Sequence, residues 1–262
     1  MFVAWSVLLI GLVLLGGLAV WGWLERRESA RLRIRLDGRA ADLENLQRSF
    51  SRFAPDEVIE RAIAGGVSSH GERKEVTALF ADIVGYTPLS EQLEPNVLVR
   101  ILNGYFERMS QAITENRGHV STFIGDGILA LFGALAPNPW QSNDAANAAL
   151  AMRAALEDYN RELRAEGLPP LSIGVGLHRG SGVVGLVGSK QLMEFAFVGR
   201  TVNVAARVQD LTRQHGADII LTETVRAHLD PRFSLGELPA TQVKGVARPL
   251  VIYSVAGLAQ AG

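Results

Sequence analysis

The first 24 residues contain no charged side chain, and this constrains the fold of the chain more than any other feature. The segment holds 19 apolar residues, four glycines and one serine. A helix needs about 20 mostly apolar residues to cross the hydrocarbon core of a bilayer, so the length suits one crossing. Trp5 at one end and Trp21 and Trp23 at the other suit the two interfaces. We predict a retained transmembrane helix over residues 1–24.

The charges that follow this segment set its expected orientation. Residues 25–39 carry six arginines against three acidic residues. Positive charge usually stays on the cytoplasmic side, so we expect a single-pass protein of the inner or plasma membrane with the rest of the chain in the cytoplasm. Two alternatives stay open: a buried core helix, and a cleaved signal peptide, whose positive charge would precede the apolar run.

Residues 25–71 are the predicted cytoplasmic linker. From Leu32 to Phe53 the apolar residues recur at spacings of four and three, with Arg39 in one slot. This pattern is typical of a two-stranded coiled coil, which would hold two copies of the chain together. An amphipathic helix packed on its own domain fits this stretch equally well. A glycine-rich joint closes the linker.

The composition restricts what the rest of the chain can do. The chain is 48% hydrophobic, has 26 basic and 27 acidic side chains, and has no cysteine. A disulfide scaffold, a cysteine-ligated metal and a thiol nucleophile are therefore excluded. The net charge of −1 argues against nucleic acid as a partner. We place one globular domain at residues 72–256 and a short tail at 257–262.

Strand and helix patterns alternate through this domain. The opening order β-α-β-β-α-β predicts an α+β fold of the ferredoxin-like, palm type, with helices on one face of the sheet. Ser142 or Asn143 is the expected N-cap of the second long helix. The expected strands are 76–84, two between 119 and 133, 171–178, 195–198, 217–222 and further strands within 233–255; the expected helices are 88–116, 142–166 and 201–214.

One apparent motif is discounted. Residues 180–185 spell G-x-G-x-x-G, but they follow a predicted strand and run into β-branched residues. A dinucleotide site needs a helix at this point, because the N-terminus of that helix receives the pyrophosphate. We interpret these residues as strand glycines that admit a close backbone approach.

Two carboxylates are candidate cation ligands. Asp82 lies near the end of the first predicted strand, and Asp126 lies in a Gly-Asp-Gly turn. Carboxylates on turns at the ends of adjacent strands suit Mg²⁺, which prefers hard oxygen ligands. The alternative for each residue alone is a turn-forming role.

Two polar residues of the predicted helix 201–214 are candidate phosphate ligands. Asn203 and Arg207 are four residues apart and therefore share one helix face. An amide and a guanidinium on one face could bind a phosphate, and arginine could stabilise charge during phosphoryl transfer. A solvated arginine in a local salt bridge is the alternative.

Three sequence blocks together resemble one protein family. They are FADIVGYT at 80–87, FIGDG at 123–127 and VGRTVNVAAR at 198–207. In this order and spacing they resemble the catalytic domain of class III nucleotidyl cyclases, here of the membrane-anchored bacterial type, over residues 72–256. Such domains convert a nucleoside triphosphate into its 3′,5′-cyclic monophosphate and pyrophosphate. They work as dimers with sites at the interface, so the resemblance implies a homodimer.

The resemblance also implies roles for individual residues. Asp82 and Asp126, with the backbone carbonyl of Ile83, would bind two divalent cations, Mg²⁺ or Mn²⁺. Asn203 would orient the ribose, and Arg207 would stabilise the charge on the α-phosphate. In the family these last two residues come from the opposite subunit.

The sequence departs from the family pattern at the positions that bind the purine base and the triphosphate. Adenylyl cyclases usually have Lys at the position of Thr122 and Asp or Thr at the position of Ala196. Guanylyl cyclases typically have Glu and Cys there. The triphosphate-binding lysine corresponds to Lys244, which stands in a Val-Lys-Gly sequence.

We therefore expect a membrane-anchored adenylate cyclase that makes cyclic AMP from ATP in intracellular signalling. Two alternatives remain. One is a cyclase of relaxed or guanine specificity, because alanine offers no side-chain hydrogen bond to a base. The other is a catalytically weak, dimeric nucleotide-binding module with a regulatory role.

Overall fold

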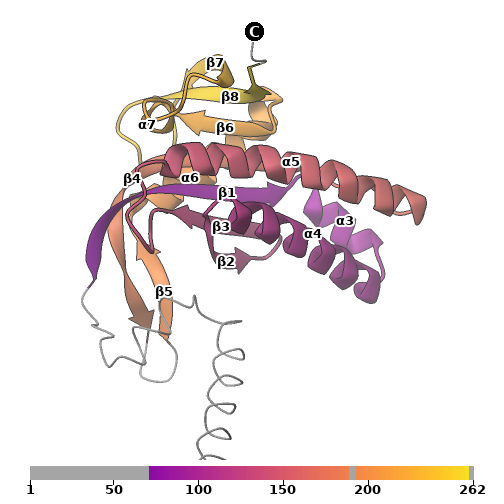
Figure 1. Ribbon diagram of the computed structural model, residues 1–262. Helices are drawn as coiled ribbons and strands as arrows, with labels where there is room; N and C mark the ends of the chain where they lie inside the picture. The colour runs from indigo at the N-terminus through magenta and orange to yellow at the C-terminus, as the bar shows by residue number, and fades with distance from the viewer. Residues whose placement is uncertain (1–70, 189–192, 260–262) are drawn as a thin grey trace, which may run out of the picture. The chain divides into compact units, whose positions relative to one another are not determined.

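The computed structural model describes residues 71–188 and 193–259 (Figure 1). The predicted transmembrane helix and coiled coil lie outside the described residues. Within the described ranges, no helix combines the length and the apolar character that a membrane crossing requires. Membrane anchoring and the coiled coil therefore stay predictions.

The described chain opens with the expected order of elements. On one side of the strand β1 the sheet runs to β3 and then β2, and on the other side it meets β4, so the order is β2-β3-β1-β4. This is the ferredoxin-like arrangement, and the prediction of a βαββαβ palm is confirmed. The elements are β1 (Glu72–Ile83), α3 (Tyr86–Gln92), α4 (Pro95–Glu115), β2 (His119–Ile124), β3 (Gly127–Phe132), α5 (Gln141–Ala165) and β4 (Ile173–Gly188).

The remaining elements extend this sheet past β4. Strand β6 pairs with β4 in parallel, and β8 and β7 follow in antiparallel pairing. Strand β5 pairs with the far half of β4 and forms a hairpin with it. These elements are β5 (Met193–Val198), α6 (Arg200–His215), β6 (Ile219–Thr222), α7 (Glu223–Arg226), β7 (Phe233–Thr241) and β8 (Leu250–Leu258).

Helices cover both faces of the sheet (Figure 1). Successive side chains of a strand point to opposite faces. Leu79, Ala81 and Ile83 of β1 join the core under α4 and α5, whereas Ala78 of β1 packs with Ala205 of α6. The expected placement of helices on one face holds for α4 and α5, and α6 covers the other face. That helix carries part of the candidate site.

Small residues bring α6 directly onto β4. A Cβ atom on Gly176 would lie 2.8 Å from the Cα of Gln209, and closer still to the backbone of α6. A Cβ atom on Gly182 would lie 2.5 Å from Cε1 of Phe197 in β5. Gly182 lies in β4 and is closely approached there, so the interpretation of residues 180–185 as strand glycines is confirmed.

The predicted helix 88–116 is wrong in one respect, because the structure has two helices there. Pro95 is the first residue of α4, and Glu94 before it has the extended angles φ −59° and ψ 140°. Proline disfavours the helical conformation in the residue that precedes it. The chain therefore ends α3 at Gln92 and begins a new helix.

The predicted N-cap of α5 is also wrong. Trp140 occupies the N-cap position and makes no side-chain capping bond, while Ser142 and Asn143 lie buried in the first turn. Their side chains make tertiary contacts instead. The Ser142 hydroxyl lies 3.2 Å from that of Thr77, and the Asn143 side-chain oxygen accepts the backbone N–H of Asp230 at 2.7 Å. Tertiary packing thus overrides the local capping preference.

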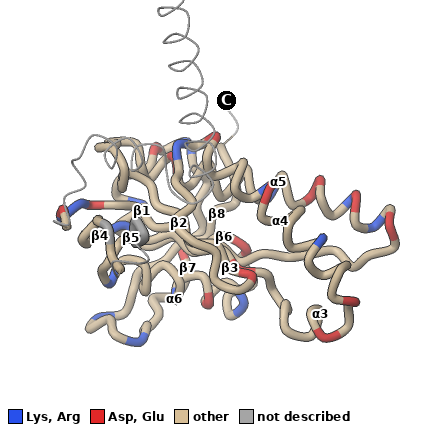
Figure 2. Tube along the Cα trace, turned by 90° about the horizontal axis from the view of Figure 1, so that it is seen from below, with Lys and Arg blue, Asp and Glu red and all other residues tan. Residues whose placement is uncertain are grey.

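Both signs of charge lie along α5 (Figure 2). Two ion pairs of 2.6 Å join α5 to α4, Arg100 to Glu166 and Arg108 to Glu162. Exposed pairs of this kind typically contribute about 0.2–1 kcal/mol each. The stability of the helical layer therefore depends mainly on its apolar face.

Candidate active site

Asp82 and Asp126 lie together at one end of the sheet, and we call them the carboxylate pair. Asp82 is the penultimate residue of β1, and Asp126 lies in the turn between β2 and β3. Because β3 is the neighbour of β1, this turn lies beside the end of β1. The Oδ2 atom of Asp126 accepts the backbone N–H of Ile83 at 3.2 Å. The two carboxylates that the sequence predicted as partners are thus brought together.

The electrostatics of the carboxylate pair favour a bound cation. The pKa of Asp82 is raised to about 7, chiefly by burial and then by its hydrogen bond to Asp126 and the charge of Asp126. Two adjacent carboxylates cannot both ionise without a compensating positive charge. A divalent cation would supply that charge, so this donor set fits one.

The backbone must supply part of any coordination shell. In the described part of the chain, His, Asp and Glu do not form a group of three or more that could hold a metal ion. Mg²⁺ commonly takes only one or two carboxylates and completes its shell with other oxygens. Ile83 is a buried residue next to Asp82, and its carbonyl is the backbone candidate that the family resemblance implied.

An aromatic contact supports the turn that carries Asp126. The ring of Phe123 in β2 lies 4.4 Å from that of Phe106 in α4, measured between centroids. Gly125 in the turn has φ +63°, a conformation that glycine adopts without strain. The glycine and the aromatic contact together hold Asp126 next to β1. The sequence indicated the turn but not the contact.

A second group of predicted residues gathers at α6, and we call Asn203, Arg207 and Lys244 the α6 group. Asn203 is exposed and Arg207 is half-buried on the same helix. The Arg207 guanidinium lies over the turn that follows Lys244, because a Cβ atom on Gly245 would be 2.9 Å from its Nη1. Gly245 also has φ +75°. The positive φ favours glycine at this position.

The two groups have separate contacts within one chain. Asp82 meets Asp126 and, at 3.9 Å, the guanidinium of Arg213. Arg207 instead lies at the turn of Gly245. The sequence analysis missed Arg213, although a basic residue in the last turn of a predicted helix was a readable signal.

The two positions expected to read the base lie on different strands. Thr122 is exposed on β2, and its hydroxyl donates to the carbonyl of Phe123 at 3.3 Å. Ala196 is half-buried on β5, where it pairs with Gly185 of β4. In the order of the sheet β3, β1 and β4 separate the two strands.

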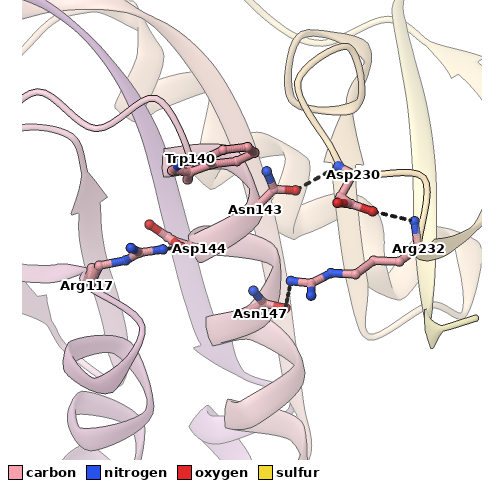
Figure 3. Close-up of a pocket in the computed structure, with 7 residues that line it drawn as sticks. All are labelled: Arg117, Trp140, Asn143, Asp144, Asn147, Asp230 and Arg232. Carbon is pink, nitrogen blue, oxygen red and sulfur yellow. Dashed lines mark hydrogen bonds and ion pairs between the residues drawn. The ribbon is translucent and has the colours of Figure 1, made fainter.

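A pocket of about 300 Å³ lies elsewhere, at the start of α5 (Figure 3). Its polar side chains are largely bound to one another. Arg117 pairs with Asp144, which is buried, and the backbone N–H of Arg232 donates to Asp230 at 2.9 Å. None of the predicted site residues lines it. Its seven lining residues are Arg117, Trp140, Asn143, Asp144, Asn147, Asp230 and Arg232.

The fold and the two groups define a domain of the nucleotidyl cyclase class. Residues 69–257 match the family model described as the adenylate and guanylate cyclase catalytic domain. The chain therefore belongs to the class III cyclase family, as the sequence blocks indicated.

Individual relatives agree with this assignment. An adenylate cyclase of Anabaena cylindrica is 37% identical over 218 residues, which are 79% of this chain and 42% of that protein. The crystal structure of the guanylyl cyclase Cya2 is 35% identical with a TM-score of 0.68, and covers 72% of this chain and 95% of its own. The adenylyl cyclase CyaB from P. aeruginosa is 28% identical with a TM-score of 0.68, and covers 73% of this chain and 98% of its own. This chain thus spans about two fifths of the length of the Anabaena relative.

Proposed function

We propose that this chain is a membrane-anchored adenylate cyclase that converts ATP into 3′,5′-cyclic AMP and pyrophosphate. The observation that carries the proposal is the division of the predicted residues into the carboxylate pair and the α6 group. Neither group alone could perform the reaction. The division suits a homodimer in which each site combines the carboxylate pair of one subunit with the α6 group of the other.

The reaction forms a bond between the ribose 3′-oxygen and the α-phosphorus, breaks the bond from that phosphorus to the pyrophosphate, and releases the 3′-hydroxyl proton. Divalent cations, when bound, would supply charge neutralisation at the triphosphate and favour ionisation of the 3′-hydroxyl. Asp82, Asp126 and the carbonyl of Ile83 would hold them.

The α6 group would position the substrate and stabilise its charge. The planar guanidinium of Arg207 can donate two parallel hydrogen bonds to phosphate oxygens. Held over the Gly245 turn, it would meet the negative charge that builds on the α-phosphate as pyrophosphate leaves. Lys244 beside that turn would bind the triphosphate, and the amide of Asn203 would orient the ribose.

A cyclase that uses GTP is the second candidate. The observation in its favour is the 35% identity with the guanylyl cyclase Cya2, which is close to the 37% identity with the Anabaena adenylate cyclase. Ala196 offers no polar side-chain atom, and the Thr122 hydroxyl is bound to the backbone of its own strand. A site without directional contacts discriminates weakly between bases.

The proposal places the catalytic domain on the cytoplasmic side of a membrane. Its support is the uncharged segment 1–24 and the arginine-rich segment 25–39 after it. ATP is abundant in the cytoplasm, so this orientation gives the enzyme access to its substrate. Recovery of the protein in the membrane fraction, and its loss from that fraction when 1–24 are deleted, would test the anchor.

The decisive test is production of cyclic nucleotide by the purified full-length chain, given ATP or GTP separately with Mn²⁺ and then with Mg²⁺. We expect cyclic AMP from ATP, and no product from Asp82→Ala, Asp126→Ala or Arg207→Ala, each of which should remain folded. Cyclic GMP alone would establish the second candidate. A folded dimer without any product would indicate a regulatory nucleotide-binding module instead.

Mixed dimers test whether two subunits share each site. Asp82→Ala subunits lack an intact carboxylate pair, and Asn203→Ala subunits lack an intact α6 group. In a mixed dimer one of the two composite sites contains neither change. We expect each variant alone to be inactive and the mixture to regain activity. Random mixing makes half of the dimers mixed, and each mixed dimer has one intact site of two, so the activity should reach up to about a quarter of wild type. Absence of recovery in a mixture shown to form mixed dimers would contradict the shared site.

A further inference from the structure

Arg213 faces the carboxylate pair from the last turn of α6. Its Nη2 atom lies 3.9 Å from Oδ2 of Asp82. The Arg213 side chain is 55% exposed, whereas the Asp82 side chain is 27% exposed. At this distance the two groups attract each other without a short hydrogen bond. The contact is therefore one that a stronger partner of Asp82 could displace.

A glycine brings this turn of α6 to the row of Asp82. Gly174 of β4 is the register partner of Asp82 in β1. A Cβ atom on Gly174 would lie 2.8 Å from Nε2 of Gln209 and closer still to the hydroxyl of Thr212. The helix thus lies directly on the strand beside Asp82, with Arg213 as the next residue after Thr212. The close approach of α6 to β4 at this point therefore depends on a glycine at position 174.

Arg213 differs in position from the arginine of the α6 group. Six residues of an α-helix advance about 9 Å along the axis and turn about 240°. Arg207 accordingly lies over the Gly245 turn, whereas Arg213 lies at the carboxylate of its own chain. Arg207 and Arg213 would therefore serve different sites.

We propose that Arg213 is an internal counter-ion of the carboxylate pair, which competes with divalent cations for Asp82 and so weakens their binding. The proposal rests on the proposed function, because it takes Asp82 and Asp126 as the cation site. A cation that binds Asp82 must separate the carboxylate from the guanidinium. Part of the binding free energy is then spent on breaking the Asp82–Arg213 attraction.

The expected effect follows from the strength of such pairs. Ion pairs with partly exposed partners contribute about 0.2–1 kcal/mol, which corresponds to a change of up to about fivefold in a binding constant. Removal of the charge in Arg213→Gln should therefore tighten Mn²⁺ binding by about two- to fivefold. Arg213→Lys keeps a positive charge and should bind Mn²⁺ within about twofold of wild type.

The experiment measures the dissociation constant for Mn²⁺ from the paramagnetic resonance signal of the free ion, with full-length protein and no nucleotide, at about pH 8, where the Asp82 carboxyl is mostly ionised. Arg161→Gln is the matched control, because it removes the same charge from a 71% exposed arginine that pairs with Asp158 on its own helix. We expect Arg213→Gln alone to bind more tightly, and we expect 0.5 M salt to reduce the difference. Equal or weaker binding by Arg213→Gln would overturn the proposal.

Asp82→Ala separates this proposal from the one on which it rests. If wild type binds Mn²⁺ and Asp82→Ala does not, the cation site stands and the Arg213 comparison decides the competition by itself. If Asp82→Ala binds Mn²⁺ as wild type does, the assignment of the cation site fails and the role of Arg213 fails with it. The readout is binding, so it does not depend on turnover.

Discussion

Substitution of Gly176 by alanine tests the packing that holds α6 on the sheet. The glycine lies in the first third of β4, and the added Cβ atom would be 2.8 Å from the Cα of Gln209 and closer to neighbouring backbone atoms. Backbone atoms of a packed helix cannot rotate away as a flexible side chain could. The helix must shift outward, and it carries Asn203 and Arg207 with it.

The magnitude follows from overpacking a buried site. Extra methyl or methylene groups in a well-packed core cost about 1–3 kcal/mol. Alanine in a strand gains about 0.5–1 kcal/mol over glycine, which offsets part of that cost. Because the contacts are with backbone atoms, the overpacking cost should lie at the upper end of its range, so we expect Gly176→Ala to lower the free energy of unfolding by about 2 kcal/mol. For a domain of this size the melting temperature would fall by about 4–8 °C.

Gly257→Ala is the matched control for this substitution. Gly257 is also a strand residue, in β8, and a Cβ atom there would have no heavy atom within 4 Å. Urea unfolding of the two variants and wild type separates the steric cost from the intrinsic preference of alanine. If Gly176→Ala were as stable as Gly257→Ala, the close approach of α6 to β4 would be refuted.

Two further predictions concern polar groups that are wholly or partly buried. The Tyr105 hydroxyl is buried without a hydrogen-bond partner among the described residues, whereas the Tyr159 hydroxyl donates to the carbonyl of Ile101 at 3.1 Å. Tyr105→Phe should therefore leave the free energy of unfolding unchanged or raise it, and Tyr159→Phe should lower it by about 0.5–1.5 kcal/mol. If urea unfolding showed Tyr105→Phe to be less stable than Tyr159→Phe, these contacts would be contradicted. The second prediction follows from the raised pKa of Asp82, about 7, because the carboxyl must lose its proton before it binds a cation. Mn²⁺ affinity should rise by about tenfold between pH 6 and pH 8. If titrations at the two pH values gave the same affinity, Asp82 would already be ionised at pH 6, contrary to this prediction.

Local sequence patterns were sufficient for most of the fold. A short apolar run identified β1, and the Gly-Asp-Gly turn identified the β2–β3 hairpin, because hydrophobic patterning and turn chemistry are properties of neighbouring residues. The order of these elements was enough to predict the ferredoxin-like sheet. The errors occurred where tertiary contacts compete with local preference. Ser142 makes a contact with Thr77 instead of capping α5.

The candidate site was likewise predictable from the sequence only in part. The motif blocks identified Asp82, Asp126, Asn203 and Arg207 by residue type and spacing, because the chemistry of cation and phosphate binding demands those types. Pairing of the two carboxylates was expected from the strand ends, and the structure provides the hydrogen bond from the backbone of Ile83 that fixes it.

The sequence by itself determined which residues are candidates for the chemistry of a cyclase and which elements carry them. Only the tertiary structure decided which of them meet within one chain. The raised pKa of Asp82 and its contact with Arg213 depend on burial and on a distance across segments more than 100 residues apart. Electrostatic interactions act through space, so their strength follows from the packing of α6 on β4 and cannot be obtained from the order of residues along the chain.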